Sequence, residues 1–377
     1  MEKYNSRLYS INIDWPGMFF SVFKCFGNQE INQPASREIL IYPGVVFFME
    51  KKLKLALIGA RGHVGYVTRV LKDLPELDLC AVSSGSSESA ETLINISRDL
   101  GYSARVYDDY ITMLDTEKPD IVSVCGPFEL HARMCCDCLE RNIHVFCEKP
   151  IALSLEELDM IRASYEKCAP GTKIISMVGF RGEAPFRTAY DAVQKGLIGK
   201  VKMINTRKSY KLGKRPAYYH DRKTYGGTIP WVGSHALDWI CWFGGAKFKT
   251  IHAIHDTSDN GGNGTLEMTA LVTCVLENNV MASASIEFLR PAGAPTHGDD
   301  QVRVAGTQGV VEVMHGKVTL ITADVCRELE LLPERGIFYD FARHILYGEP
   351  CVVDAEETFE LTRACLEARD FADQHEI

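Results

Sequence analysis

Two blocks of the sequence carry side chains that could move a proton. Glu148-Lys149-Pro150 follows a predicted strand, and Ser234-His235-Ala236-Leu237-Asp238 opens a predicted helix that Ser234 caps. A lysine held at a strand end can donate a hydrogen bond to a reacting hydroxyl, and a histidine can accept a proton from an alcohol near neutral pH. Spacing alone leaves structural alternatives open, namely a surface salt bridge for the first block and a capping turn for the second.

A glycine-rich turn lies upstream of both blocks. The apolar run 53–58 reads as a strand buried on both faces, and glycines spaced G-x-x-G-x-x-G follow it before a predicted helix from Val64 to Leu74. Such a turn lets backbone N–H groups meet a phosphate, although the middle glycine of the usual G-x-G-x-x-G pattern is displaced. We expect it to bind a dinucleotide through Gly59, Ala60, Arg61, Gly62, His63 and Val64.

The end of the second predicted strand bears on the choice of cofactor. NAD-binding sheets place an Asp or Glu near this point to bind the ribose hydroxyls, whereas this chain has Ser83 and Ser84. Arg61 in the facing turn could pair with a 2′-phosphate. These residues favour NADP over NAD, and the alternative is that the serines form a turn and the pocket accepts either cofactor.

The elements that must position these residues fall into segments of different pattern. Strands and helices alternate over residues 51–178, which predicts a Rossmann domain, an α/β fold with a doubly wound parallel sheet. Residues 179–335 predict an α+β domain for substrate binding and oligomerisation, with a mostly antiparallel open sheet. Two amphipathic helices over 336–377 are expected to pack back on the first domain. Residues 1–48 show no clear period, and our hypothesis is that they are an upstream extension outside the native protein, which would start at Met49.

Composition excludes several classes of function. A formal net charge of −9 gives no basic surface for nucleic acid, and the sequence shows neither a signal peptide nor a membrane span. Thirteen cysteines, an odd number, read as reduced thiols of a cytoplasmic protein. A zinc site is not expected because paired C-x-x-C spacing is lacking among Cys135, Cys136, Cys138 and Cys147. A small-molecule ligand and no metal is the prediction.

Five motifs, in this order and spacing, resemble the glucose-fructose oxidoreductase, inositol dehydrogenase and rhizopine-catabolism family over about residues 51–376. The resemblance implies NAD(P)-dependent hydride transfer to or from a secondary alcohol or ketone of a sugar, glycoside or cyclic polyol. It also implies a homodimer or homotetramer. The motifs are Gly59–Gly65, Cys125-Gly126-Pro127-x-x-x-His131, Glu148-Lys149-Pro150, Gly226-Gly227 to His235-x-x-Asp238, and Ala305-Gly306-Thr307-Gln308-Gly309.

The resemblance also implies individual roles. Lys149 matches the lysine that touches the reacting hydroxyl, His235 the proton acceptor, and Asp238 a substrate-binding acid. Many members have an Asp four residues before the histidine, where this chain has Trp231. Either His235 works without that partner or Lys149 takes a larger share of the proton transfer. The motifs implied to bind cofactor contain Cys125, Gly126, Pro127, His131, Glu148 and Lys149.

Aromatic residues near the presumed cleft suit a sugar ring. Trp231 and Tyr219 are expected to stack against the substrate, and domain packing is their alternative role. Two other functions remain open, a reductase of a non-sugar substrate and a cofactor-binding regulator without turnover. The presence of both Lys149 and His235 argues against the regulator, because a sensor needs neither side chain.

Overall fold

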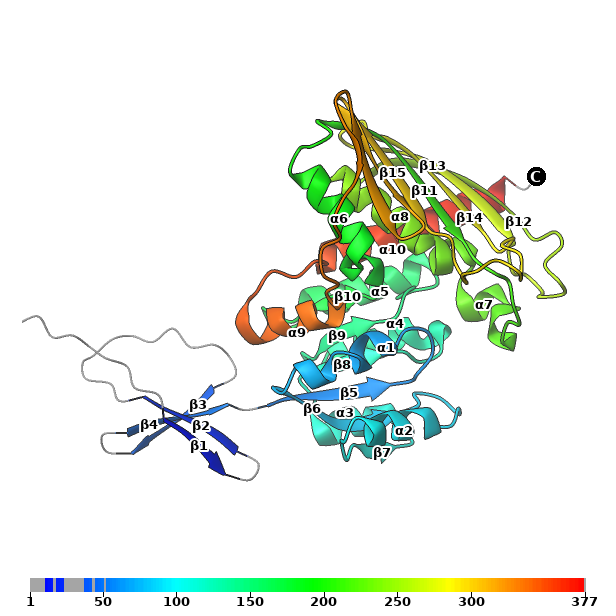
Figure 1. The fold of residues 1–377 in the computed structure, drawn as a ribbon. Helices are drawn as coiled ribbons and strands as arrows, with labels where there is room; N and C mark the ends of the chain where they lie inside the picture. Colours follow the sequence, from blue (N-terminus) through cyan, green and yellow to red (C-terminus); the bar gives the residue numbers. More distant parts are fainter. Residues whose placement is uncertain (1–10, 16–17, 24–36, 43–44, 51, 376–377) are drawn as a thin grey trace, which may run out of the picture.

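The structure, a computed structural model, describes residues 11–15, 18–23, 37–42, 45–50 and 52–375. Two large sheets organise it, six-stranded in the N-terminal domain and eight-stranded in the C-terminal domain. Figure 1 shows the six-stranded sheet below and the eight-stranded sheet above, with α5 and α10 between them. The predicted fold class, a Rossmann domain followed by an α+β domain, is confirmed.

A small antiparallel sheet precedes the Rossmann domain, in a region where we predicted no strands. Its four strands pair in the order β1-β2-β4-β3. The sequences of β2 and β3 are rich in Phe, Ile and Val, which favour extended backbone. Met49, the predicted start, lies inside β4, and the hypothesis about residues 1–48 stays a prediction. The strands are β1 (Ile11–Trp15), β2 (Met18–Phe23), β3 (Arg37–Tyr42) and β4 (Val45–Glu50).

The Rossmann sheet is entirely parallel, with strand order β10-β9-β8-β5-β6-β7. Its central strands are buried because helices cover both faces, which explains their continuous apolar sequences. The strands are β5 (Leu53–Ile58), β6 (Leu77–Ser83), β7 (Arg105–Tyr107), β8 (Ile121–Val124), β9 (His144–Cys147) and β10 (Ile174–Ser176). The helices are α2 (Glu91–Asp99), α3 (Tyr110–Glu117), the 3₁₀ turn η2 (Phe128–Leu130), α4 (His131–Leu139) and α5 (Leu155–Lys167).

The helix after the glycine turn is shorter than predicted. A single helix over 64–74 was expected, whereas α1 (Gly65–Thr68) ends after four residues and a separate 3₁₀ turn, η1 (Leu71–Asp73), follows. The segment 64–70 contains three valines and a threonine, whose β-branched side chains lose rotamer freedom in a helix. The prediction of one continuous helix was wrong for this reason.

The C-terminal sheet follows the order β12-β13-β14-β11-β15-β16-β17-β18, and only the β11–β14 pairing is parallel. Its strands are β11 (Val201–Ser209), β12 (Phe248–Asp256), β13 (Thr269–Leu276), β14 (Met281–Glu287), β15 (Gln301–Gly306), β16 (Gly309–Met314), β17 (Lys317–Thr322) and β18 (Cys326–Glu328). The intervening elements are the 3₁₀ turn η3 (Gly179–Gly182), α6 (Ala184–Gln194), the 3₁₀ turn η4 (Ala217–Tyr219), α7 (Arg222–Tyr225), the π-helical turn η5 (Ile229–Gly233) and α8 (Ser234–Gly244).

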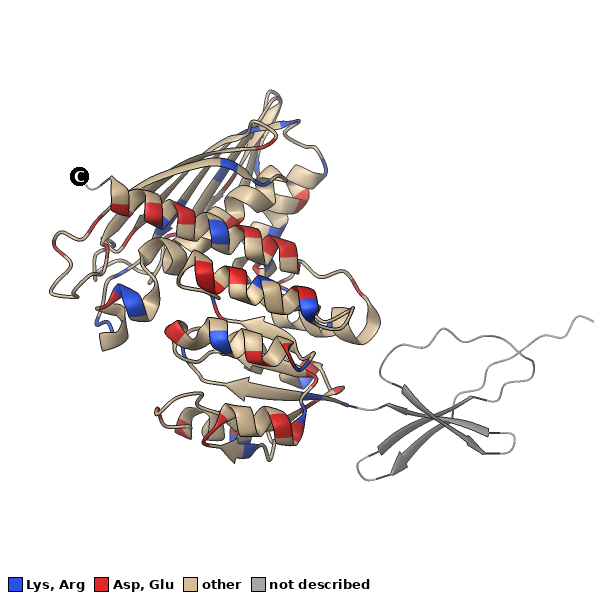
Figure 2. Cartoon of the chain, turned by 180° about the vertical axis from the view of Figure 1, so that it is seen from behind, with Lys and Arg blue, Asp and Glu red and all other residues tan. Residues whose placement is uncertain are grey.

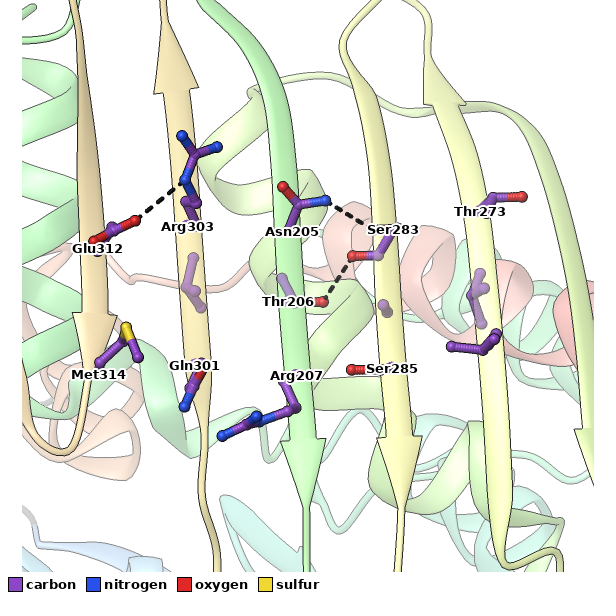
Figure 3. A pocket seen from close by; sticks show the side chains of 14 residues that line it. Asn205, Thr206, Arg207, Thr273, Ser283, Ser285, Gln301, Arg303, Glu312 and Met314 are labelled. Atoms are coloured by element: carbon purple, nitrogen blue, oxygen red, sulfur yellow. Dashed lines mark hydrogen bonds and ion pairs between the residues drawn. The ribbon is translucent and has the colours of Figure 1, made fainter.

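The two faces of this sheet differ because side chains alternate along a strand. In β11, Ile204, Thr206 and Lys208 are buried on the face that α8 covers. The opposite face carries a shallow pocket of about 530 Å³, and Figure 3 shows Asn205, Ser283 and Arg303 among the polar side chains standing on it. Leu271 and Met281 of the same sheet are half exposed.

Two C-terminal helices, α9 (Ile337–Tyr347) and α10 (Ala355–Gln374), contact the Rossmann domain. Phe338 of α9 packs on Phe146 of β9 with ring centroids 5.1 Å apart. Arg369 of α10 donates from Nη1 to the carbonyl of Leu153 (2.7 Å) and to that of Gly226 (2.9 Å), so one guanidinium joins both domains.

Surface charge is mixed in sign. Figure 2 shows acidic and basic residues interspersed along the helices seen from behind, and Arg363 of α10 pairs with Asp159 of α5 at 2.7 Å. None of the helices in the described part of the chain has the length and apolar character needed to cross a membrane. The twelve cysteines that the structure describes are free, and its described side chains include no cluster suited to a metal ion.

Candidate active site

The glycine turn is fixed between the ends of two neighbouring strands. Gly59 has φ +76°, and a Cβ there would lie 2.3 Å from the carbonyl oxygen of Cys125 and 2.4 Å from Cα of Gly126. Its N–H donates to the carbonyl of Ser83 at 2.8 Å, and the N–H of Arg61 donates to that of Cys125 at 2.8 Å. Only glycine lets the chain leave β5 this close to β8.

Glu148 connects this turn to the lysine block. Its buried carboxylate accepts from the backbone N–H of His63 at 2.7 Å and faces Nδ1 of the same residue at 2.9 Å. A Cβ on Gly62, which has φ +64°, would lie 2.7 Å from that carboxylate. Burial raises the pKa of Glu148, but His63 and then Lys149 outweigh it and hold the pKa below its ordinary value. The carboxylate therefore stays ionised beneath the turn.

The serines after β6 form a tight turn, as the sequence allowed. The N–H of Gly85 donates to Oγ of Ser83 at 3.3 Å, and Oγ of Ser84 donates to the carbonyl of Ser86 at 2.8 Å. Arg61 faces the same region.

Arg61 already has a carboxylate partner that the sequence reading missed. Its Nη2 lies 2.6 Å from Glu88, and its guanidinium carbon lies 4.3 Å from the ring centroid of Tyr218. Glu88 follows the last residue of β6 by five positions, beyond the point where an acid is usually sought. The turn thus carries an Arg–Glu pair in place of a free arginine.

Lys149 lies at the carboxyl end of β9, in a cis Lys149–Pro150 peptide. Its ammonium donates to the carbonyl of Trp231 at 2.9 Å, lies 3.5 Å from the centroid of that indole, and is 3.8 Å from Glu148. Burial lowers the pKa of Lys149 to about 8. The lysine is therefore a buried donor and not part of a surface salt bridge.

His131 holds the backbone on either side of this lysine. Its Nδ1 lies 2.9 Å from the carbonyl oxygen of Pro150, and its Nε2 lies 3.1 Å from that of Gly126. The ring is completely buried, and burial lowers its pKa. This geometry gives His131 a positioning role between the loop after β8 and the lysine block. The cofactor contact implied for Pro127 and His131 stays a prediction.

His235 occupies the first turn of α8. Its Nδ1 is buried and has no hydrogen-bond partner among the described residues. The rings of Phe180 and His63 contact it edge-on, with centroids 4.7 and 6.3 Å away. Burial, followed by the charges of Lys149 and Lys208, holds the pKa of His235 well below its usual value. The imidazole is neutral and can accept a proton.

The start of α8 differs from the prediction. The π-helical turn η5 runs directly into α8, so Ser234 lies inside the helix and its Oγ donates to the carbonyl of Trp231 at 2.9 Å. The helix therefore lacks the Ser234 cap that we expected, because helical backbone precedes that residue.

Asp238 has a different partner from the expected substrate. Its carboxylate accepts hydrogen bonds from Nη2 of Arg181 at 2.7 Å and from Nε at 3.0 Å, and both side chains are 1% exposed. Arg181 also donates to the carbonyl of Val352 and to Glu357, each at 2.7 Å. This ion pair joins η3, α8 and α10 and engages the carboxylate, and substrate binding by Asp238 stays a prediction.

Trp231 and Tyr219 lie side by side, with ring centroids 5.7 Å apart, and both are largely buried. Phe128 packs on Trp231 at 4.6 Å. Because the ammonium of Lys149 covers the indole, Trp231 orients the lysine through both its ring and its carbonyl. Sugar stacking on these two rings stays a prediction.

A pocket of about 700 Å³ opens beside this cluster, between α1, η3 and the start of α9. Tyr66 and Glu183 line it, and the Tyr66 ring stacks on His63 at 5.1 Å. A Cβ on Gly179 would lie 2.1 Å from the Tyr66 ring, so glycine at that position makes room for the tyrosine. Burial raises the pKa of Glu183 to about 7.

The two domains each match a known family. Residues 53–169 match the oxidoreductase family with an NAD-binding Rossmann fold, and residues 186–312 match the GFO/IDH/MocA C-terminal domain. The chain belongs to the Gfo/Idh/MocA family of oxidoreductases.

Several relatives of this Gfo/Idh/MocA protein are informative. A solved Thermotoga maritima structure described as an oxidoreductase is 41% identical, with a TM-score of 0.82 over 86% of this chain and 98% of its own. D-glucoside 3-dehydrogenase of Escherichia coli K12 is 28% identical over 217 residues, 53% of this chain and 57% of that enzyme. An inositol dehydrogenase homologue from Azotobacter vinelandii, solved with NAD⁺, is 20% identical and shares the fold, with a TM-score of 0.73 over 87% of this chain and 97% of its own.

The residues present fit the nicotinamide dinucleotide that the Gfo/Idh/MocA family implies. Gly59 and Gly62 keep the turn after β5 free of side chains, at the carboxyl edge where doubly wound sheets bind ligands. His235 and Lys149 face the same edge, one with an orphaned nitrogen and the other with a buried ammonium.

Sequence reasoning missed two buried cations of this Gfo/Idh/MocA protein, Arg181 and Lys208. The partner of Arg181 is 57 residues away, so local spacing could not reveal it. Lys208 did leave a signal, because alternation along β11 places it on the same face as Ile204 and Thr206, where a lysine is unexpected.

Proposed function

We propose that this NAD(P)-dependent oxidoreductase transfers a hydride between its cofactor and a secondary alcohol or ketone of a sugar, glycoside or cyclic polyol. The observation that carries the proposal is the pairing of an unpartnered His235 Nδ1 with the buried ammonium of Lys149, beside the glycine turn. D-glucoside 3-dehydrogenase and the inositol dehydrogenase homologue among its relatives support this substrate class.

In the direction of oxidation, the substrate hydroxyl lies between the two side chains. Lys149 donates to the hydroxyl oxygen and stabilises the negative charge that develops there. His235 accepts the hydroxyl proton at Nδ1, which it can do because its ring is neutral. The bound nicotinamide supplies the hydride acceptor. Trp231 fixes the lysine, and the aromatic rings around His235 exclude water.

For the cofactor we propose NAD rather than the NADP that the sequence slightly favoured. Glu88 neutralises Arg61, and its carboxylate would repel a 2′-phosphate. The relative solved with NAD⁺ supports the same choice.

The test is to follow absorbance at 340 nm with a panel of sugars, inositols and glycosides and both oxidised cofactors. Turnover of a member of the panel by the wild-type chain, with strong loss in Lys149→Met and in His235→Asn, is the expected result. Lys247→Met, which removes an exposed lysine paired with Glu360, is the matched control. Near-normal turnover in both active-site variants would overturn the residue assignment. Binding of NAD⁺ without turnover of any substrate would favour the regulator.

We also propose that the uncovered face of the C-terminal sheet joins two copies of the chain. Half-exposed Leu271 and Met281 beside the polar side chains of Figure 3 support this contact. Light scattering of wild type and of Leu271→Lys tests it, because a dimer or tetramer should dissociate in the variant. The free thiols support a reducing compartment such as the cytoplasm.

A further inference from the structure

Lys208 is a second lysine buried in the candidate active site, and the mechanism above does not use it. Its side chain is 0% exposed, and its ammonium lies 2.5 Å from Oδ2 of Asp300. A lysine is almost never fully buried without a partner, because desolvation of its charge costs free energy. One carboxylate oxygen satisfies only one of its three N–H donors.

Three aromatic rings also lie around the ammonium, and Glu183 is near enough for its charge to act on it. The ammonium lies 3.6 Å from the ring centroid of Phe180, 4.7 Å from that of Tyr210 and 5.2 Å from that of Trp239. Ring faces attract a cation but do not accept a full hydrogen bond. Donor capacity therefore remains at the ammonium.

Asp300 offers the complementary group. Its Oδ1 is buried and has no hydrogen-bond partner in the part of the chain that the structure describes. The residue begins the approach to β15, next to the end of β11, so the two strands hold the pair in place. Lysine donates only and an ionised carboxylate accepts only, whereas an alcohol hydroxyl does both. The unused groups of the pair match one hydroxyl.

The pair borders the proton-transferring residues. Phe180, which contacts the Lys208 ammonium, also packs on the ring of His235. Tyr66, which stacks on His63, carries a pKa raised by burial and by the charges of Glu148 and Asp300 among others. His235 thus lies among groups from both lysine sites, with Lys149 from the Rossmann domain and Lys208 from the C-terminal sheet.

We propose that Lys208 and Asp300 form a binding site for a second hydroxyl of the substrate, near the hydroxyl that Lys149 and His235 oxidise. Lys208 donates a hydrogen bond to the oxygen of that hydroxyl. Oδ1 of Asp300 accepts a hydrogen bond from the same hydroxyl and does not take its proton. The site selects polyhydroxylated substrates over simple secondary alcohols. This inference rests on the proposed function, because it assigns a second contact to the same substrate.

The test compares Lys208→Met with wild type on the substrate found in the panel and on its monodeoxy derivatives. In wild type, removal of one particular hydroxyl should lower kcat/KM by about 10–100-fold, the usual effect of losing a hydrogen bond to a charged group. On the full substrate, the kcat/KM of Lys208→Met should be lower than that of wild type by a similar factor. On that one derivative, the kcat/KM of the variant should be less than about threefold below that of wild type. NAD⁺ affinity, measured by calorimetry, should stay within about twofold, because the site does not touch the cofactor.

Asp300→Asn is the second variant, and it keeps the size of the side chain while weakening the acceptor. It should show the same selective loss, smaller in size, and Lys247→Met again serves as the control. Thermal unfolding confirms that each variant is folded. If Lys208→Met does not fold, the decision passes to Asp300→Asn alone.

Two different results would overturn this inference alone or the proposed function as well. A folded Lys208→Met enzyme that keeps kcat/KM within threefold, or that loses the same factor on the full substrate and on every derivative, overturns this inference while leaving the proposed function intact. Absence of turnover on every sugar, glycoside and polyol in wild type overturns the proposed function, and this inference with it.

Discussion

Two clusters of buried charge lie along α8, and they differ in how completely their polar atoms are paired. Asp238 and Arg181 satisfy one another, and Glu357 and a backbone carbonyl take the remaining nitrogen. One turn earlier on the same helix, His235 is equally buried but leaves Nδ1 without a partner. Burial is alike in the two clusters, so the presence of unused hydrogen-bonding atoms is what distinguishes a site for a ligand from a structural ion pair.

The largest effect on activity is expected from substitutions at His235 and Lys149, the cluster that keeps unpaired polar atoms. Lys149→Met and His235→Asn should each lower kcat by about 10²–10⁴-fold, because each removes a group that acts on the reacting hydroxyl. Thermal unfolding should show that both variants fold, and it measures the cost of Lys149→Met, which leaves the buried carboxylate of Glu148 with His63 as its remaining partner. A loss of activity that tracks a loss of stability would erase the difference between the two clusters.

Substitutions in the fully paired cluster of Asp238 and Arg181 should instead lower stability. Asp238→Ala leaves the guanidinium of Arg181 buried without its main partner and should lower the free energy of unfolding by about 3–5 kcal/mol. Glu357→Gln, at a partly exposed contact of the same arginine, should cost no more than about 1 kcal/mol. Denaturant titration measures both. A stable, folded Asp238→Ala enzyme that binds substrate weakly would instead support the predicted substrate-binding role of Asp238.

The two clusters should also respond differently to pH. Burial lowers the pKa of Lys149 and of Lys208 to about 8, so both ammonium donors are lost as the pH rises through that value, whereas Arg181 stays charged. His235, with its lowered pKa, remains neutral across this range. Because two donors are lost together, we expect kcat/KM to fall by about ten- to a hundredfold per pH unit above that point while near-UV circular dichroism stays unchanged to pH 9. Activity that rises through pH 8 would assign the base to the neutral amine of Lys149.

The smallest effect concerns a third ion pair, at the glycine turn. Glu88→Gln removes the nearer carboxylate partner of Arg61, leaving Glu129 at 3.7 Å, and with it a charge that repels a 2′-phosphate, so affinity for NADP⁺ should rise relative to NAD⁺ by about three- to tenfold. Arg61→Gln should weaken NADP⁺ binding and leave NAD⁺ binding nearly unchanged. Calorimetry with both cofactors measures the ratio, and an unchanged ratio in Glu88→Gln would remove Arg61 from cofactor selection.

Sequence patterns predicted the fold far better than the site's partners. Alternation is local, so the parallel strands of the Rossmann domain were recognised, whereas β1–β4 were not. The His235 and Asp238 spacing correctly placed both on one helix, but it could not show that Arg181 would take the acid. Contacts such as Lys208 to Asp300 join residues 92 positions apart and depend on two strands meeting, which no spacing reveals.

The close packing at Gly179 makes the position of His235 depend on the size of residue 179. The glycine belongs to the segment that leads into the C-terminal domain, while the Tyr66 ring it accommodates belongs to the helix after the glycine turn. One extra methyl group at Gly179 would push that ring toward His63, which borders His235. A single methyl group added at Gly179 would therefore displace the proton acceptor, His235, through the stacked rings of Tyr66 and His63, without altering any charge.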